Sequence, residues 1–348
     1  MEKPKKDAAA RRKRARVDGG MATMSSDLNV KTAWLYYVEG LTQAQIGDRL
    51  NISRIKVMRT LAACTAEGVV VTTINAETAG QIALERRLER RWNLDAAIVV
   101  PTPSEAGHLE RAIGHAVALY MGEWMQDGMT LAIGGGATLH SCLGFLVRRQ
   151  LEDASVIGLV GSLPHSRWIN PSIVAAKVAD VFGVDSYTIT APVVVHDAAL
   201  RELLWAQPEL LDVRRRAAAA DIAFITVGEI SRDATIFRHG IVPDRLIPSL
   251  RAKGAEANIL SYFVDAQGRP VDHEVNGRVM AIGLDVVSAI PNVVLAAAGR
   301  HKIAAIRAAL AAVDVDVLIT DSETAAALGG EEQDQIRPRS RRKSSMPT

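Results

Sequence analysis

The chain has 348 residues, a formal net charge of +2, and 48% hydrophobic but only 4% aromatic residues, which suits a globular protein large enough for two domains. No stretch reaches the roughly 18 unbroken apolar residues of a membrane span, and the basic start lacks the apolar block of a secretory signal. The two distant cysteines, Cys64 and Cys142, fit a reducing compartment, so we expect a cytoplasmic protein.

Basic residues gather at both ends of the chain. Residues 1–27 include the run from Arg11 to Arg16, and the stretch Arg337–Lys343 is also basic. Runs of this kind are usually disordered and solvated, and they can add nonspecific attraction to DNA phosphates. We therefore expect disordered tails over residues 1–27 and 329–348.

Residues 28–75 are predicted to form a helix-turn-helix domain. In LTQAQIGDRLNISRIKVMRTL (41–61), Thr42 can cap a first helix, Asn51 tolerates the left-handed turn, and Ser53 can cap a second helix that begins at Arg54. The second helix would enter the major groove of DNA. The segment GVVVTTIN (68–75) reads as a short β-wing.

The exposed face of the second helix carries the predicted DNA contacts. Basic side chains there can bond guanine edges or phosphates, and polar side chains of the first helix can contact phosphates. The predicted contact residues are Thr42, Gln43, Gln45, Ser53, Arg54, Ile55, Lys56, Met58 and Arg59. The alternative interpretation is a solvated helical hairpin without a role in nucleic-acid binding.

Residues 76–94 are predicted to form a linker helix. Its apolar stripe of Ile82, Leu88 and Trp92 could pack against a partner subunit or against its own domain. Because one helix-turn-helix contacts few base pairs, we also expect a homo-oligomer, either a dimer or a tetramer.

Residues 95–328 alternate apolar runs with helical patterns, which predicts a parallel α/β domain. The helices are expected around 108–126, 171–182 and 301–313. The strands are expected at 96–100, 130–134, 155–160, 186–195, 221–228, 278–284, 292–299 and 315–320.

Several blocks, in order, resemble the SorC family of bacterial sugar-responsive transcription regulators. They include ISRIKVMRTLAACTAEGVV, LDAAIVVPTP, IGGGATL, the segment from GSLPHSRWINPSIVAAKV to APVVV, DIAFITVGEI and AAAGRHKIAAIRAAL. The resemblance spans about residues 30–328. It implies a winged helix-turn-helix followed by an effector domain similar to the NagB and ribose-5-phosphate isomerase type, with the ligand at the carboxyl ends of the strands.

The resemblance also implies a set of effector-binding residues. The glycine-rich loop would hold a phosphate or a hydroxyl group, and the other residues would supply polar contacts or a cation. They are Gly134, Gly135, Gly136, Ala137, Thr138, Asn170, Gly228, Glu229, Glu256, Asn258, Asp265 and Lys302. Gly136 and Ala137 stand where the family often has larger or polar residues, so both a phosphorylated effector and an uncharged polyol stay open. Asp265 could instead serve only the predicted turn that ends at Gly268.

These features favour a DNA-binding regulator, expected to be a repressor of a sugar or polyol catabolic operon. The effector would be a sugar, polyol or sugar phosphate. The alternatives are a sugar-phosphate isomerase or deaminase with an accessory DNA-binding domain, and an architectural DNA-binding protein. We expect no catalytic residues, no cofactor and no metal, since Asp272 and His273 lack a clear third ligand.

Overall fold

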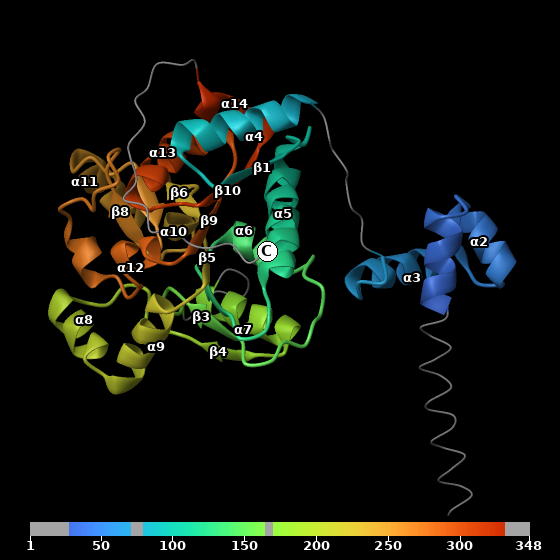
Figure 1. Cartoon of the computed structure of the whole chain (residues 1–348), viewed down its shortest axis with the longest axis horizontal. Helices are drawn as coiled ribbons and strands as arrows, with labels where there is room; N and C mark the ends of the chain where they lie inside the picture. The colour runs from blue at the N-terminus through green and yellow to red at the C-terminus, as the bar shows by residue number, and fades with distance from the viewer. Residues whose placement is uncertain (1–27, 71–78, 164–169, 331–348) are drawn as a thin grey trace, which may run out of the picture. The chain divides into compact units, whose positions relative to one another are not determined.

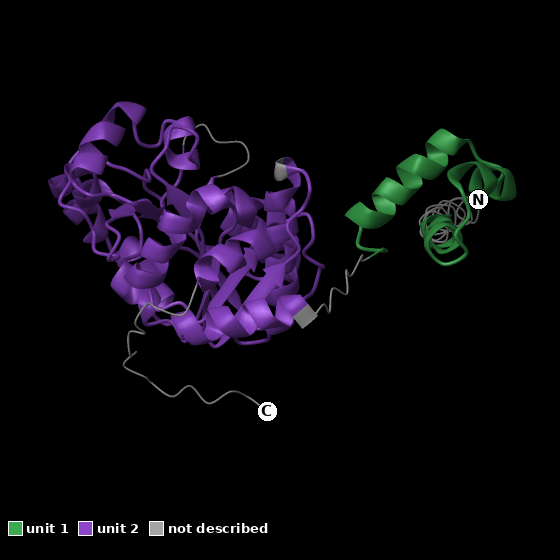
Figure 2. Ribbon diagram, turned by 90° about the horizontal axis from the view of Figure 1, so that it is seen from above, with its two compact units in different colours: residues 1–75 green, residues 76–348 purple. Residues whose placement is uncertain are grey.

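The computed structural model describes residues 28–70, 79–163 and 170–330. The chain divides into two compact units, residues 1–75 and 76–348, which Figure 2 colours separately. The predicted wing and both basic tails lie largely or wholly outside the described residues. Within the described part, no helix combines the length and apolarity that crossing a membrane requires.

The first unit contains a helix over residues 28–37 followed by α2 (Gln43–Leu50) and α3 (Arg54–Ala66). Leu35, Ile46, Val57 and Leu61 are buried together and form its small core. Asn51 ends α2 in the left-handed conformation, with φ 53°, as the sequence predicts. The predicted helix-turn-helix is therefore confirmed in its local geometry.

The second unit is built on a seven-stranded parallel sheet in the order β1-β10-β9-β5-β2-β3-β4 (Figure 1). Its strands are β1 (Ala96–Val100), β2 (Thr130–Ile133), β3 (Ser155–Gly158), β4 (Asp185–Tyr187), β5 (Ile222–Ile225), β9 (Asn292–Ala296) and β10 (Val317–Asp321). Buried apolar residues fill both faces of the inner strands, which is typical of a parallel sheet covered on two sides, whereas β4 at one edge has no buried residue.

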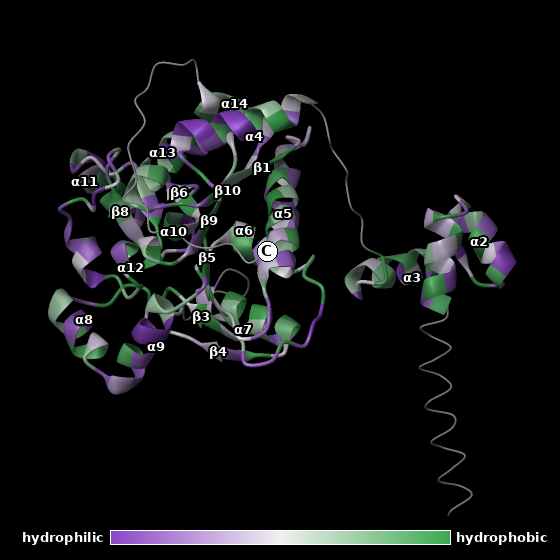
Figure 3. Cartoon of the chain, viewed as in Figure 1, coloured by the Kyte–Doolittle hydropathy of each residue, from purple (hydrophilic) through white to green (hydrophobic). Residues whose placement is uncertain are grey.

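Helices cover the two faces of the sheet and create two apolar layers. One layer packs beneath α5 (Leu109–Trp124), α6 (Ala137–Cys142) and α7 (Pro171–Phe182). The other packs beneath α4 (Ala79–Trp92), α9 (Pro208–Ala218), α12 (Leu284–Ser288), α13 (Ile303–Ala312) and α14 (Ser322–Gly329). Figure 3 shows hydrophobic and hydrophilic residues alternating along these helices, as amphipathic helices require.

The predicted linker helix is α4, and its contacts show where the apolar stripe packs. Leu88 is fully buried in the core of the second unit, and Leu84 and Trp92 pack against that core. Ile82 stays 48% exposed. The stripe therefore packs mainly on its own domain.

A small antiparallel sheet was not predicted. It contains β6 (Val227–Glu229), β7 (Ala257–Ile259) and β8 (Tyr262–Val264). The turn between β7 and β8 places Leu260 and Ser261 at positive φ. Tight turns of this kind usually contain Asn or Gly, so the sequence carries no signal for the hairpin. Helices α10 (Thr235–Arg238) and α11 (Ile247–Ala252) adjoin it through a third apolar cluster.

Two predicted strands are wrong in extent. The segment 186–195 forms strand only in β4, and residues 278–284 form no strand. Both segments contribute buried residues to the core, but only isolated bridges hold them, such as Val194 to Val279 and Ser162 to Pro192. Pro192 lacks the N–H that a continuous ladder needs, so the apolar pattern indicates burial without a strand.

Asp265 serves the turn that the sequence predicts at this position. Its Oδ1 accepts from the backbone N–H groups of Gln267 and Arg269, and the N–H of Gly268 donates to the Asp265 carbonyl. These hydrogen bonds, first of all from the Arg269 backbone, lower the pKa of the Asp265 carboxyl. At Gly268, φ is +77°, and a Cβ would lie 2.3 Å from the Ala312 nitrogen at the end of α13.

The buried carboxylate of Asp321 joins the ends of β9 and β10. Its Oδ1 accepts from the Gly299 N–H at 3.2 Å, and its Oδ2 accepts from the Thr102 hydroxyl at 2.6 Å and the Thr324 N–H at 3.4 Å. Burial by itself raises the pKa of this carboxyl, but the hydrogen bonds outweigh it and lower the pKa below 3.8. Asp321 therefore fixes the turn that leads into residues 300–302.

We expect Gly268→Ala to destabilise the second unit more than Gly254→Ala. Both glycines have positive φ, but nothing lies within 4 Å of a Cβ at Gly254, whereas one at Gly268 meets backbone. The expected loss of unfolding free energy is about 1 kcal/mol at Gly254 and about 2–4 kcal/mol at Gly268. Urea unfolding of both variants measures the difference, and equal losses would contradict the proposed clash.

We expect Asp321→Asn to reduce the free energy of unfolding by about 1–3 kcal/mol at neutral pH. The folded chain lowers the pKa of Asp321, so the stabilisation is complete above 3.8 and is lost as the pH falls through the lower folded value. The difference between the two proteins should therefore shrink below that pH. Urea titrations over a pH series test this, and a difference independent of pH would refute it.

Candidate DNA-binding surface and effector cavity

Side-chain caps define the starts of α2 and α3 in the first unit, and the cap of α2 is reciprocal. The Thr42 hydroxyl accepts from the Gln45 N–H at 3.3 Å, and the Gln45 Oε1 accepts from the Thr42 N–H at 2.9 Å. The Ser53 Oγ accepts from the Lys56 N–H at 3.2 Å. Thr42, Gln45 and Ser53 thus fix the geometry of α2 and α3, and Gln43 is partly exposed.

The face of α3 opposite the core is open and basic. Val57 and Leu61 point into the core, and Ile55 and Met58 are 60% and 53% exposed. The exposed residues of this face are Arg54, Ile55, Lys56, Met58 and Arg59. Charged donors beside two apolar side chains can contact phosphates, base edges and thymine methyl groups.

A cavity of about 1050 Å³ opens at the carboxyl ends of the parallel strands. The loops after β2, β5 and β9 contribute Gly135, Thr226 and Lys302 to its lining. Between β2 and β5 the strand order changes direction, and open parallel sheets bind ligands at such a point. The volume is sufficient for a small ligand.

The glycine-rich loop after β2 is tied to the neighbouring strand. The Thr226 hydroxyl donates to the Gly135 carbonyl at 2.8 Å. A Cβ at Gly135 would lie 2.7 Å from Pro171 Cγ, and one at Gly136, where φ is +113°, would lie 2.8 Å from the Thr226 hydroxyl. Packing against the protein itself therefore accounts for these two glycines.

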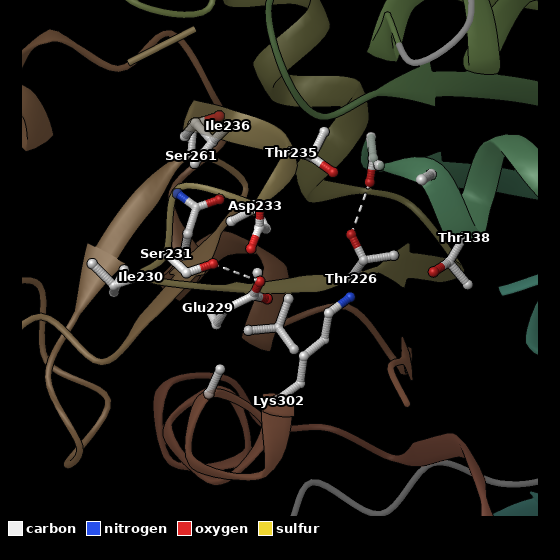
Figure 4. Close-up of a pocket in the computed structure, with 18 of the residues that line it drawn as sticks. Thr138, Thr226, Glu229, Ile230, Ser231, Asp233, Thr235, Ile236, Ser261 and Lys302 are labelled. Atoms are coloured by element: carbon white, nitrogen blue, oxygen red, sulfur yellow. Dashed lines mark hydrogen bonds between the residues drawn. The ribbon is translucent and has the colours of Figure 1, made fainter. Parts of the chain in front are cut away.

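Polar side chains of the small sheet and of α13 complete the wall (Figure 4). Glu229 ends β6, and the Ser231 hydroxyl donates to its Oε1 at 2.9 Å. Lys302, at the start of α13, points toward Thr226. The lining thus combines hydrogen-bond acceptors with a cationic donor.

The structure gathers most of the effector-binding residues that the resemblance implies. Those that line the cavity are Gly135, Gly136, Ala137, Thr138, Gly228, Glu229, Glu256, Asn258 and Lys302. The other three lie elsewhere. Gly134 continues the strand ladder by donating to the Phe224 carbonyl, Asn170 caps α7 and bonds Ser162 and Leu163, and Asp265 forms its turn.

Some residues that line the cavity were not predicted from the sequence as effector-binding residues, among them Thr226, Ser231, Asp233, Thr235 and His301. Thr226 directly follows a buried strand, which is a signal for a site residue in a parallel sheet. Ser231, Asp233 and Thr235 reach the cavity because β6 leaves the main sheet, which the sequence pattern did not indicate.

Asp272 and His273 do not form a metal site with the described residues. Asp272 faces the Lys253 ammonium at 3.4 Å, and His273 lies 3.0 Å from the Ser249 hydroxyl while its Nδ1 accepts from the Val275 N–H. In the described ranges, no group of three His, Cys, Asp or Glu side chains is placed to hold a metal ion.

Comparisons with known proteins agree with this architecture. Residues 76–328 match the family model described as "Putative sugar-binding domain". The transcriptional regulator LsrR of Klebsiella pneumoniae is 36% identical over 319 residues, which cover 89% of this chain and 94% of that protein. The erythritol catabolism regulatory protein EryD of Brucella abortus is 30% identical over 313 residues, covering 89% of this chain and 99% of EryD.

Solved structures show the same fold. The full-length sorbitol operon regulator SorC from Klebsiella pneumoniae superposes with a TM-score of 0.67 at 24% identity, covering 87% of this chain and 99% of SorC. The family match covers most of the second unit, and each of the two curated relatives covers 89% of the chain. The chain belongs to the SorC family of transcriptional regulators that carry a sugar-binding domain.

Proposed function

We propose that the protein represses a sugar or polyol catabolic operon and that a small hydroxylated molecule in the cavity controls its affinity for operator DNA. The exposed basic face of α3, held by the Ser53 cap, supports the DNA-binding role. The names of the relatives EryD and SorC, which regulate erythritol catabolism and a sorbitol operon, support the choice of operon. We place this activity in the cytoplasm of a bacterial cell.

The control would work by linkage between the two units. A ligand that binds one arrangement of the protein better than another shifts the population toward that arrangement. If the arrangements differ in their affinity for DNA, occupancy of the cavity changes DNA binding by roughly 5–150-fold. We propose a homo-oligomer as the acting form, since two recognition helices would then read two half-sites.

We further propose that the cavity binds its ligand without converting it. Isomerases and deaminases need a general base matched to a substrate carbon. The Glu229 carboxylate is bonded to Ser231, and Asp265 lies in a turn outside the cavity lining. The relatives are named as regulators, which supports sensing rather than catalysis.

We expect Arg54→Ala and Arg59→Ala each to weaken DNA binding by about tenfold or more, because each removes a charged donor from the groove-facing surface. Arg49→Ala is the matched control. It removes the same charge from the same unit, at a side chain already paired with Glu39 at 3.1 Å. Fluorescence anisotropy with a duplex selected from a random pool by the unaltered protein measures the effect, and unchanged affinity of both variants would contradict the docking of α3.

We expect Lys302→Met to abolish the response of DNA binding to ligand while DNA binding without ligand is unchanged. Lys302 lines the cavity, whereas the control residue Lys253 does not and pairs with Asp272. A thermal-shift screen with four- to six-carbon polyols, aldoses and their phosphate esters identifies the ligand. DNA titrations of Lys302→Met and of the control Lys253→Met with that ligand follow. A full response of Lys302→Met would argue against the cavity as the effector site.

A further inference from the structure

The helix α4 covers the open edge of the parallel sheet. Strand β1 lies at one end of the strand order and pairs with β10 on its other side. On the open side, the Glu89 Oε1 accepts from the Ala97 N–H at 3.3 Å, and the Glu85 Oε1 accepts from the Val99 N–H at 3.0 Å. The Gln81 amide donates to the Val99 carbonyl. Side chains of α4 therefore make the hydrogen bonds that a further strand would make.

Two sets of contacts fix α4. Residues 81, 85 and 89 are four apart, so they lie on one helix face and hold α4 along β1. At the last turn, the Trp92 Nε1 donates to the Leu328 carbonyl at 3.3 Å, and Arg91 donates to the Gly329 carbonyl at 3.1 Å, both at the end of α14. The chain passes from α3 into the second unit through the first turn of α4. The contacts with β1 are nearer to that turn than the contacts with α14.

Strand β1 is in turn bonded to the turn that carries Lys302. The Thr102 hydroxyl, just after β1, donates to the Asp321 carboxylate at 2.6 Å. The Gly299 N–H donates to the same carboxylate at 3.2 Å and to the Thr324 hydroxyl at 2.8 Å. Asp321 and Thr324 are buried, and Lys302 lines the cavity. A continuous series of hydrogen bonds and strand backbone thus connects the cavity wall with α4.

We infer that Glu85 and Glu89 are positioning residues that carry a change in the cavity wall to α4. A ligand that displaces residues 299–302 would act through Asp321 and β1 on the place where α4 is held, and so on the chain that leads to α3. The inference rests on the proposed control of DNA binding by the cavity and names part of its route. The alternative is that the two glutamates only cover the edge of the sheet. A measurement of coupling separates these roles.

The test uses the selected DNA duplex as its probe, because linkage is reciprocal and DNA must alter the cavity wall if the wall alters DNA binding. Hydrogen–deuterium exchange of the full chain is followed by mass spectrometry with and without the duplex. In the unaltered protein, we expect DNA to change the exchange rate within residues 299–303 by about fivefold or more. In Glu85→Ala/Glu89→Ala, that change should fall below about twofold while fluorescence anisotropy still shows DNA binding.

Two control proteins separate the hydrogen bonds from charge and from general destabilisation. Glu85→Gln/Glu89→Gln keeps an oxygen that accepts from the same N–H groups, so the change in exchange should return. Glu209→Ala removes an exposed carboxylate from α9 and should respond as the unaltered protein does. Thermal unfolding checks that each variant folds. If the double alanine variant does not fold, Glu85→Ala is measured in its place and should reduce the change less strongly, because Glu89 still holds β1.

An undiminished change within residues 299–303 in the alanine variants would overturn the inference, since the glutamates would then only cover the edge. Loss of the change in the glutamine variant as well would contradict the role of the hydrogen bonds. Exchange that DNA leaves unaltered there, although the duplex is bound, would overturn the inference and leave the DNA-binding role standing. An unaltered protein that selects and binds no duplex would contradict the proposed function, and this inference with it.

Discussion

The cavity depends on how the ends of β2 and β5 are joined. The hydrogen bond from the Thr226 hydroxyl to the Gly135 carbonyl, at 2.8 Å, connects the loops that follow these two adjacent strands. At this point the strand order changes direction, so the connections from the two strands run to opposite sides of the sheet, and the cavity opens beyond the carboxyl ends of the strands. Asp321 provides the corresponding restraint further along the edge, where it holds Gly299 ahead of Lys302.

The two units meet different physical demands. The helix pair of the first unit needs only a small core, because caps at Thr42 and Ser53 fix its ends, and it can expose charge on α3. The cavity of the second unit needs a rigid frame, which two apolar layers supply. In the proposed function, a ligand can change the affinity of the protein for DNA only if the ligand binds two arrangements of the protein with different affinities.

Local patterns predicted much of this structure. The α2–α3 turn followed from Asn51 and its flanking caps, and the parallel sheet followed from apolar runs between helices. The β7–β8 hairpin did not follow, because Leu260 and Ser261 adopt a turn conformation that their residue types disfavour. The segment around Pro192 was predicted as a strand because residues that are buried without strand pairing give the same apolar pattern as a strand. For the cavity, the resemblance supplied Glu229 and Lys302, whereas Asp233 and Thr235 depend on long-range packing that no local pattern encodes.

Reciprocal linkage between the cavity and the α3 surface tests the central claim most directly. The measurement is the affinity of the effector for the protein, by calorimetry, with and without a saturating amount of the selected duplex. If occupancy of the cavity governs DNA binding, DNA must change effector affinity by the same factor by which the effector changes DNA affinity. Equal factors, each of about fivefold or more, are the predicted result. An effector affinity that is identical with and without DNA would contradict the account.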